Sequence, residues 1–417
     1  MGLTMKERKA ITRELYERYK KATKKEKGVI LDEFTVLTGY NRAYASYLLI
    51  THGKTIKVAR GRVIKADVKI KAKRQKKRHY DESVKRVLTK IWTIYSYPCG
   101  KRLKPILGEA VARLKGFGEI SIDRDTDERL SKISASTIDR LLKEEKKKYE
   151  LKGRSHTKPG TLLKSQIPIR TFSEWDEQRP GFIEVDLVGH EGGDPRGEFI
   201  QSLCAVDIYS GWTEIDAVRN KAQKWVLEAI DKMRGRLPFE LLGLDSDNGA
   251  EFINDHLYRY CLSNKITFTR SRKYRKNDNC YVEQKNYSVV RKYAGYFRYD
   301  TEEELQVLKE LYRYLRLYIN FFQPIMKQVS KVRVGSKVIK RYDTAKAPYQ
   351  RLLEFSHISD TVKRKLERQY ELLNPAELHR HIVRLKVQLI EMVAYKKTER
   401  SMKPVYHKRC NSCYAYV

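Results

Sequence analysis

Between residues 181 and 272 the sequence changes from helical to strand-like patterning, and this change does most to limit the possible folds. Three apolar or alternating runs, separated by turns that contain glycine, occupy 181–189, 198–210 and 213–220. Helix, strand, helix and strand patterns then follow at 221–235, 241–247, 255–264 and 266–272, and another helix begins near Cys280. Three strands followed by alternating helices and strands are typical of a mixed α/β fold.

Residues 5–50 have helical patterning. Gly39 separates two helical stretches, and Arg42 lies at the start of the second. A helix, a glycine turn and a second helix predict a helix-turn-helix unit, with Arg42 as a candidate DNA contact. A plain three-helix packing unit fits the same residues equally well.

Residues 81–148 predict a second helical unit. Amphipathic stretches lie before and after Pro98 and Gly100, and a third stretch begins after Ser134, a side chain suited to an N-cap. The polar face of this third helix would present side chains to a major groove as a recognition helix does. The side chains concerned are Ser136, Thr137 and Arg140.

The charge points to a polyanionic partner. Lys and Arg total 87 against 52 Asp and Glu, a net charge of +35. Nucleic acid would offset the self-repulsion of such a chain, although ribosomal and membrane-surface proteins are also basic. Residues 54–78 hold twelve Lys or Arg and one acid. They predict a phosphate-tracking linker, as a short strand pair or an extended arm, in preference to a solvated face.

Six regions follow from these patterns. We expect a helix-turn-helix unit, a basic linker or arm, a second helix-turn-helix-like unit, a polar linker, a mixed α/β domain and a basic C-terminal region. The last region should contain an amphipathic helix at 302–322, a basic hairpin around Gly335 and a final helix near 375–396. The expected boundaries are 1–53, 54–80, 81–150, 151–175, 176–300 and 301–417.

The expected location is inside the cell. The chain has no apolar run of about 18 residues that could span a membrane, and its N-terminus lacks the apolar segment of a signal peptide. Its six cysteines are scattered, which favours reduced thiols over a disulfide framework.

Three acids are candidates for catalysis. Asp186 lies within an apolar strand, Asp247 ends another strand, and Glu283 lies near the start of a helix. A carboxylate in an apolar strand is costly unless it is paired, hydrogen-bonded or bound to metal. Three carboxylates brought together would be relieved by Mg²⁺ or Mn²⁺, and two such ions could support phosphoryl transfer at a phosphodiester.

Other acids compete with these candidates. Glu184 shares a strand face with Asp186, and Asp245 shares one with Asp247. Asp207 is a third competitor, although it approaches a turn, where Asp is common. Spacing alone leaves the choice open.

The series VDLVGH, AVDIYSGW, LDSDNGAEF and NCYVEQKN resembles the catalytic core of the retroviral-integrase superfamily, as found in DDE transposases of insertion sequences. The phrases TKPGTLLKSQIPIRTF and NFFQPIMKQVSK look like those of a bacterial or archaeal insertion-sequence group, which implies a location in the cytoplasm of a prokaryote, in association with the nucleoid. The resemblance implies an RNase H-like fold, a five-stranded mixed sheet with helices on both faces. It also implies that Asp186, Asp247 and Glu283, the last followed by Asn286, are the catalytic metal ligands.

Candidate DNA contacts surround the third acid. Asn286 lies one turn after Glu283 and could touch DNA or orient the carboxylate. The remaining candidates are basic side chains on the same helix or in the loop before it, and a solvated surface charge is an equally good interpretation of each. They are Lys285, Arg291, Lys292, Arg272, Lys273, Arg275 and Lys276.

Two further features are weaker. His190 could approach the site, but a structural histidine is the better interpretation. His407, Cys410 and Cys413 form an H-x-x-C-x-x-C run that lacks a fourth zinc ligand. The N-terminal zinc module of the retroviral enzymes has no counterpart in residues 1–80.

The sequence therefore predicts a transposase that assembles as a homo-oligomer on double-stranded DNA, with no membrane partner. The helical units would bind the ends of a mobile element, and the central domain would cut and join DNA with two Mg²⁺ or Mn²⁺ ions. Two alternatives remain: an RNase H-like nuclease, and a domesticated DNA-binding regulator.

Overall fold

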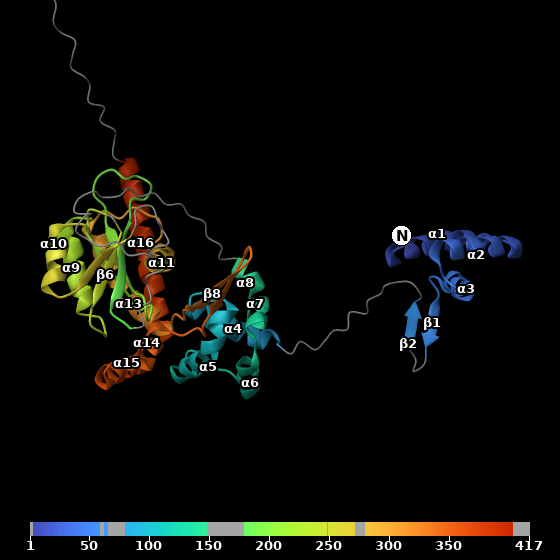
Figure 1. The fold of residues 1–417 in the computed structure, drawn as a ribbon, viewed down its shortest axis with the longest axis horizontal. Coiled ribbons are helices and arrows are strands. Elements are labelled where there is room, and N and C mark those ends of the chain that lie inside the picture. The colour runs from blue at the N-terminus through green and yellow to red at the C-terminus, as the bar shows by residue number, and fades with distance from the viewer. Residues whose placement is uncertain are drawn as a thin grey trace, which may run out of the picture. The chain divides into compact units, whose positions relative to one another are not determined.

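The computed structural model describes residues 3–58, 62–65, 80–147, 179–247, 249–271 and 280–402. The chain divides into two compact units, Met1–His79 and Tyr80–Val417 (Figure 1). No helix among the described residues is long and apolar enough to cross a membrane.

The first unit contains three helices and a short hairpin. They are α1 (Met5–Lys21), α2 (Lys24–Thr38), α3 (Arg42–Thr51), β1 (Thr55–Val58) and β2 (Arg62–Lys65). Gly39 ends α2 with a φ of 66°, a conformation that glycine adopts without steric cost. The side chain of Asn41 then caps α3 by accepting the N–H of Ala43. The expected turn between two helices is therefore present, and the strand pair lies in the basic segment that we interpreted as a pair or an arm.

Five helices open the second unit. They are α4 (Glu82–Ile94), α5 (Gly100–Gly116), α6 (Arg124–Lys132), α7 (Ala135–Leu141) and α8 (Lys143–Lys147). Ser134 caps α7 as expected, since its hydroxyl accepts the N–H of Thr137 at 3.2 Å. A Cβ at Gly100 would lie 2.0 Å from the carbonyl oxygen of Ala135, so only glycine allows α5 to begin this close to α7. The sequence pattern missed α6, a polar helix whose only buried apolar side chain is Leu130.

A mixed five-stranded sheet follows, in the order β5–β4–β3–β6–β7. Its strands lie where the sequence predicted them, although each is shorter: β3 (Phe182–Gly189), β4 (Gln201–Asp207), β5 (Thr213–Val218), β6 (Gly243–Ser246) and β7 (Thr267–Arg270). β3, β4 and β5 are antiparallel neighbours, and β6 and β7 continue the sheet parallel to β3. This is the expected RNase H-like arrangement, with β3 at the centre.

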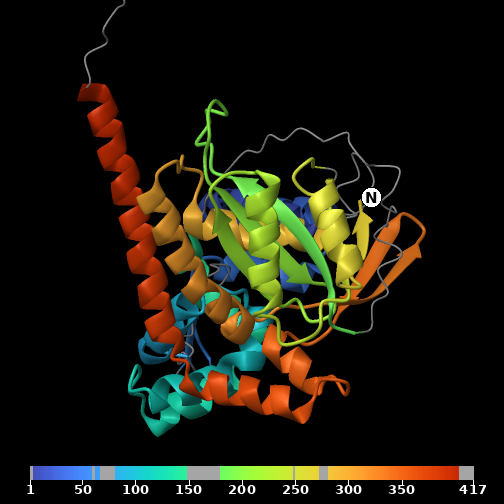
Figure 2. The same ribbon diagram turned by 90° about the vertical axis from the view of Figure 1, so that its left-hand side faces the viewer.

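Helices cover both faces of the sheet (Figures 1 and 2). α9 (Gln223–Arg234) and α10 (Asp255–Ser263) pack on one face, over Ile183 and Val185 of β3. The other face carries α11 (Cys280–Lys285), a π-helical segment (Asn286–Arg291), α12 (Lys292–Ala294) and α13 (Glu302–Phe322). Val188 of β3 faces this second layer.

The C-terminal part contains the expected long helices and hairpin. β8 (Gln328–Val334) and β9 (Lys337–Tyr342) form an antiparallel pair around Gly335. α14 (Pro348–Glu354) and α15 (Asp360–Leu372) follow, and α16 (Pro375–Met402) packs along α13.

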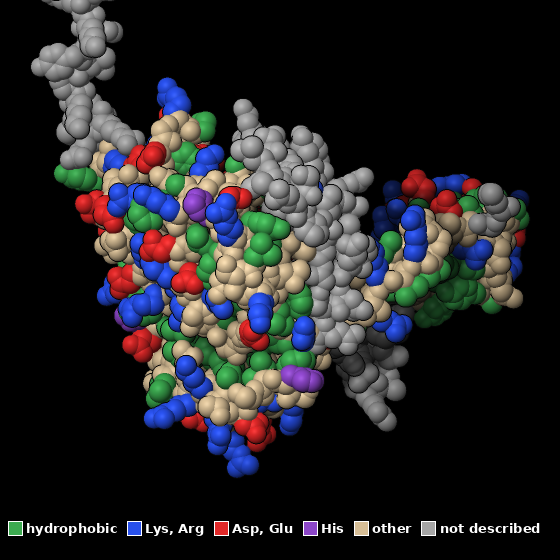
Figure 3. Space-filling model, turned by 60° about the vertical axis from the view of Figure 1, so that its left-hand side comes forward, with side chains coloured by type: hydrophobic (Ala, Val, Ile, Leu, Met, Phe, Trp, Pro, Cys, Tyr) green, Lys and Arg blue, Asp and Glu red, His purple; other side chains and the backbone are tan. Residues whose placement is uncertain are grey.

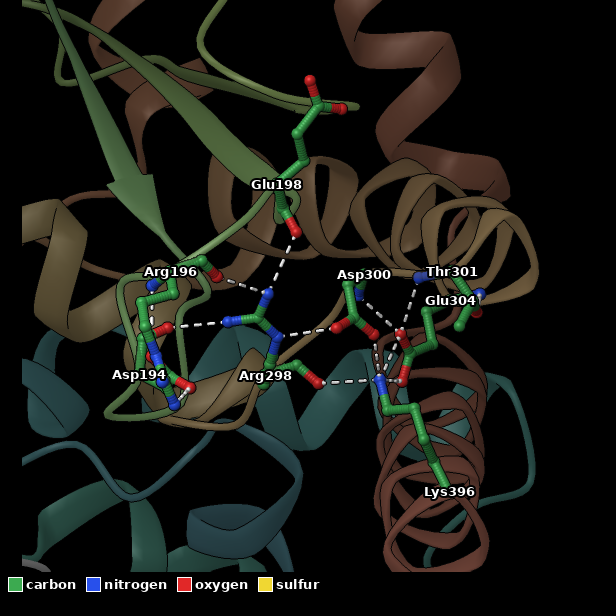
Figure 4. Close-up of polar contacts among 8 residues, drawn as sticks. All are labelled: Asp194, Arg196, Glu198, Arg298, Asp300, Thr301, Glu304 and Lys396. Atoms are coloured by element: carbon green, nitrogen blue, oxygen red, sulfur yellow. Dashed lines mark hydrogen bonds and ion pairs between the residues drawn. The ribbon is translucent and has the colours of Figure 1, made fainter. Parts of the chain in front are cut away.

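A charged network ties α16 to the loop after β3 (Figure 4). Lys396 of α16 contacts the carboxylates of Asp300 and Glu304 at 2.6 and 2.8 Å. Arg298 contacts Asp300 at 2.6 Å and donates to the carbonyl oxygens of residues 194, 196 and 198 in the β3–β4 loop. Because Glu304 is only 1% exposed, loss of Lys396 would leave a buried charge poorly compensated. The network therefore fixes the loop that follows the central strand.

Candidate active site

The central strand β3 carries the first acid. Successive side chains of a strand point to opposite faces, so Glu184, Asp186 and Val188 share the face that α11 and the π-helical segment cover. Asp186 is half-buried there and lies opposite Cys204 of β4. The carboxylate is thus presented from a rigid, central element.

Asp186 is held by two hydrogen bonds. The side-chain amide of Asn286 donates to its Oδ2 at 2.6 Å, and the N–H of Leu187 donates to its Oδ1 at 2.8 Å. Burial nevertheless raises the pKa of Asp186, and together with the negative charges of Asp247 and Glu283 it brings this pKa to about 8. Asp186 therefore lies close enough to both of the other predicted acids to be affected by their charges.

Asp247 lies just beyond the end of β6. The N–H of Gly249 donates to its Oδ1 at 2.9 Å, which fixes the carboxylate at the carboxyl end of this parallel strand. Burial raises the pKa of Asp247 as well. Asn248 lies outside the described residues.

Glu283 is exposed on α11, the helix that crosses β3 and β4. Directly after α11 the backbone changes to a π-helix that begins at Asn286. Short π-helical segments are uncommon and often occur at functional sites. This one brings the amide of Asn286 onto Asp186, which agrees with the expectation that Asn286 orients an acid, although the acid is Asp186 and not Glu283.

The chemical type of these side chains suits a divalent cation. Carboxylate oxygens are the hard ligands that Mg²⁺ and Mn²⁺ prefer, and the raised pKa of Asp186 shows a repulsion that a cation would relieve. The amide oxygen of Asn286, buried beside Asp186, has no hydrogen-bond partner among the described residues. Within the same residues, however, no three acidic, histidine or cysteine side chains converge closely enough to hold one ion. Glu283 would have to approach the two aspartates for all three to share a metal.

The competing acids have structural contacts. Asp207 accepts the N–H groups of Gly181 and Ser210 at 2.8 and 2.6 Å, so it closes the turn after β4. Asp245 accepts a hydrogen bond from the hydroxyl of Thr269 on the neighbouring strand. These contacts give both buried carboxylates a structural role.

Glu184 has a role that the sequence did not indicate. Its side chain is fully buried, and its Oε2 accepts the N–H of Val282 in the first turn of α11 at 2.8 Å. Burial raises the pKa of Glu184 well above its usual value, and the charge of Asp245 raises it further. Glu184 therefore anchors the start of the helix that carries Glu283 to the strand that carries Asp186.

The basic side chains near Glu283 differ in accessibility. Lys285 is only 8% exposed, and burial lowers its pKa to about 8. Lys292 donates to the carbonyl oxygen of Ser96 at 2.8 Å, and burial lowers its pKa to about 8 as well. Both side chains thus face the interior, in contrast to the surface positions that phosphate contacts need.

Arg291 is half-buried with its guanidinium 4.8 Å from the ring centre of Tyr296. The remaining candidates lie outside the described residues: Arg272, Lys273, Arg275 and Lys276.

The candidate contacts in the helical units lie near or at the surface. Ser136 and Arg140 are exposed on α7, and Thr137 is half-buried. Arg42 is exposed on α3 and pairs with Asp32 of α2. These positions are compatible with DNA contacts and leave the assignments as predictions.

His190 is a structural residue. Its ring is fully buried, and its Nε2 lies 2.7 Å from the hydroxyl of Ser202. Burial lowers the pKa of His190 to about 3, so the ring is neutral near neutral pH. The possible zinc ligands His407, Cys410 and Cys413 lie outside the described residues.

A surface pocket of about 910 Å³ borders the loop after Asp247. It lies between α9 and α10, and Glu251 is part of its lining. Burial raises the pKa of Glu251, and the charge of Asp247 raises it further. Glu251 is therefore a fourth carboxylate in electrostatic contact with the site, which the sequence analysis had not considered.

The raised pKa of Asp186 predicts an unusual effect of pH on stability. In the absence of divalent metal, the folded protein keeps this proton up to about pH 8, whereas the unfolded chain loses it near pH 4. Because Asp186 ionises only in the unfolded chain over this range, the free energy of unfolding falls as pH rises from 4 to 8. Asp186→Asn should remove this loss and stabilise the metal-free protein at pH 8 by at least about 1 kcal/mol.

Unfolding in EDTA at pH 5 and pH 8 measures this effect. Asp255→Asn, which alters an exposed carboxylate paired with Arg259, is the control and should change little. An Asp186→Asn protein that is less stable than wild type at pH 8 would contradict the prediction.

Comparison with known proteins gives a relative at the level of sequence. The chain is 35% identical over 349 residues to the uncharacterized protein y4rM of Sinorhizobium fredii, and the match covers 84% of this chain and 96% of that protein. No family model matches the chain.

Similar solved structures include retroviral integrase cores. The catalytic core domain of BIV integrase shares 18% identity, with a TM-score of 0.28, over 42% of this chain and 94% of that domain. The HTLV-2 integrase catalytic core domain in complex with magnesium shares 14% identity, with a TM-score of 0.26, over 35% of this chain and 90% of that domain. The fold is defined by the strand order given above and not by these scores.

Proposed function

Because the chain belongs to the same family as the uncharacterized protein y4rM, whose name states no activity, we propose a function from the site itself. The protein is a DNA transposase, a polynucleotidyl transferase that cuts DNA and joins the cut ends to a target. The observation that carries this proposal is Asp186, which lies on the central strand with its pKa raised by burial and by the charges of Asp247 and Glu283.

Asp186, Asp247 and Glu283 would hold Mg²⁺ or Mn²⁺. Two such ions, when bound, activate a water or a 3′-hydroxyl and stabilise the leaving oxygen of a phosphodiester. Asn286 fixes the orientation of the Asp186 carboxylate, and Glu184 fixes the start of the helix that carries Glu283. The protein's own residues therefore orient the carboxylates that would hold the metal ions, and the reaction needs no side-chain nucleophile.

DNA recognition would come from the two helical units. We infer that Arg42 on α3 and Ser136, Thr137 and Arg140 on α7 contact the ends of a mobile element. Because two DNA ends must be cut and joined together, we expect a homo-oligomer on DNA. The bacterial or archaeal insertion-sequence origin belongs to this proposal, as does action in the cytoplasm.

The assay uses a duplex that contains the DNA flanking the coding region, with either Mg²⁺ or EDTA. A transposase should yield 3′-hydroxyl ends and strand-transfer products in Mg²⁺ only. Cleavage confined to an RNA–DNA hybrid would favour an RNase H-like nuclease, and binding without metal-dependent cleavage would favour a regulator. Either of these results would overturn the transposase assignment.

A further inference from the structure

The β8–β9 hairpin projects from the second unit as a two-stranded ribbon (orange in Figure 2). Every side chain of both strands is exposed except that of Ser330, which is half-buried. A two-stranded hairpin that buries no face is only marginally stable in water. A binding partner that covers the ribbon would add the stabilising contacts that the ribbon lacks on its own.

The base of this ribbon is firmly attached. The N–H of Lys327 donates to Asp343 at 2.7 Å, and the N–H of Asp343 donates back to the carbonyl oxygen of Lys327 at 2.9 Å. Arg351 holds Asp343 at 2.6 Å, and the ammonium of Lys327 donates to the carbonyl oxygens of Ile208 and Tyr209 after β4. These contacts anchor the ribbon to the sheet that carries Asp186. Its two strands, β8 and β9, which we call the arms of the ribbon, extend beyond this anchor and are exposed to solvent.

The arms carry one sign of charge. Residues 328–342 contain five Lys or Arg and no acid, whereas acidic and basic side chains are interspersed over the face shown in Figure 3. Lys331 and Lys340 lie directly opposite each other across the two strands, and Arg333 shares their face. Like charges in this position destabilise a hairpin. An anionic partner would relieve that repulsion, whereas a second copy of the ribbon would increase it.

We propose that this ribbon binds duplex DNA, with Lys331, Arg333 and Lys340 in contact with phosphates. The proposal rests on the function proposed above, since it adds a second contact to the same DNA. A two-stranded antiparallel ribbon is one of the two elements that the major groove admits. Strands of seven and six residues extend about 20 Å along such a groove. The attachment to the sheet would keep the bound duplex in a fixed position relative to Asp186.

The test compares two triple variants of the full-length protein. Lys331, Arg333 and Lys340 are changed to Gln in one, and Lys232, Arg259 and Arg313 in the other. The control residues are also exposed, but each contacts an acid on its own helix. Binding to a 30-base-pair duplex is measured by fluorescence anisotropy between about 50 and 200 mM salt, the range over which phosphate contacts dominate the salt dependence.

Each lost phosphate contact should lower the salt slope by about 0.9, so the ribbon variant should lose up to about 2.7 and bind at least about tenfold more weakly. The control variant should bind as wild type does. Unchanged binding by the ribbon variant, or an equal loss in both variants, would overturn the proposal. So would a ribbon variant whose DNA affinity is normal but whose oligomeric state differs in sedimentation.

A second measurement does not depend on a folded variant. Bound duplex should protect Lys331 and Lys340 of the wild-type protein from an amine-acylating reagent while Lys232 stays reactive, and equal labelling would overturn the proposal. Metal-dependent cleavage is assayed on the same preparations. If wild type cleaves but the ribbon variant binds normally, the ribbon proposal fails alone. If neither wild type nor the variants cleave DNA but the ribbon variant binds the duplex more weakly, the proposed function is wrong and the ribbon proposal stands.

Discussion

Replacing Asp247 with Asn, or Glu283 with Gln, is expected to lower Mg²⁺-dependent DNA cleavage at least about 1,000-fold, because the bound metal contributes several kcal/mol of charge stabilisation. Both substitutions keep the shape of the side chain and remove its charge. DNA binding should stay within about twofold of wild type, since phosphate contacts elsewhere supply the affinity. Gel analysis of cleavage products and anisotropy of the uncleaved duplex measure the two effects separately.

Glu228→Gln is a suitable control for these variants. Glu228 is an exposed carboxylate on α9 that pairs with Lys232 at 2.5 Å, and its replacement should leave cleavage unchanged. If the Asp247 or Glu283 variant still carried out strand transfer at the wild-type rate, the assignment of that acid would be wrong. A loss of DNA binding in step with cleavage would instead indicate a general defect in folding.

Two substitutions of Glu184 should show whether this residue positions Glu283 or takes part in catalysis directly. Glu184→Gln keeps an oxygen that can accept the N–H of Val282, and burial, which raises the pKa of Glu184 well above its usual value, favours the neutral form of the native side chain as well. This variant should retain cleavage within about tenfold of wild type, because a neutral acceptor still holds the start of α11. Glu184→Ala should lose about 100-fold, the scale expected when a catalytic group moves by about 1 Å.

The metal dependence of these variants identifies the role. If Glu184 positions Glu283, the Ala variant needs more Mg²⁺ for half-maximal cleavage and the Gln variant does not. Loss of cleavage in both variants, with the fold and DNA binding intact, would make Glu184 a metal ligand. Full activity of the Ala variant would show that the anchor is not needed.

The succession of strands and helices along the chain could be predicted because local patterning indicates each element, whereas the five-stranded sheet was implied by the resemblance. The apolar runs at 181–220 and the strands before Asp247 and after Cys261 are all present, and they carry the acids where the sequence placed them. Helix α6 escaped prediction because its side chains are mostly polar and charged. The π-helical segment has no pattern of its own in the sequence, so the contact from Asn286 to Asp186 could not be foreseen.

Long-range packing explains the remaining differences. Nothing local to Glu184 indicates that it meets the N–H of Val282, because 98 residues separate the two in the chain. Lys285 has the sequence context of a surface charge, yet α11 turns it towards β4, where it is buried. Spacing and resemblance made the three acids candidates, whereas the effect of Asp247 and Glu283 on the pKa of Asp186 follows only from the fold.

Cleavage by wild type and by Asp247→Asn, measured over a titration from EDTA to excess Mg²⁺, tests metal-dependent phosphoryl transfer at these acids most directly. We predict that wild-type cleavage rises with Mg²⁺ and is absent in EDTA, while Asp247→Asn binds the same duplex and cleaves it at no Mg²⁺ concentration. Equal cleavage by the two proteins, or wild-type cleavage that persists in EDTA, would contradict the assignment.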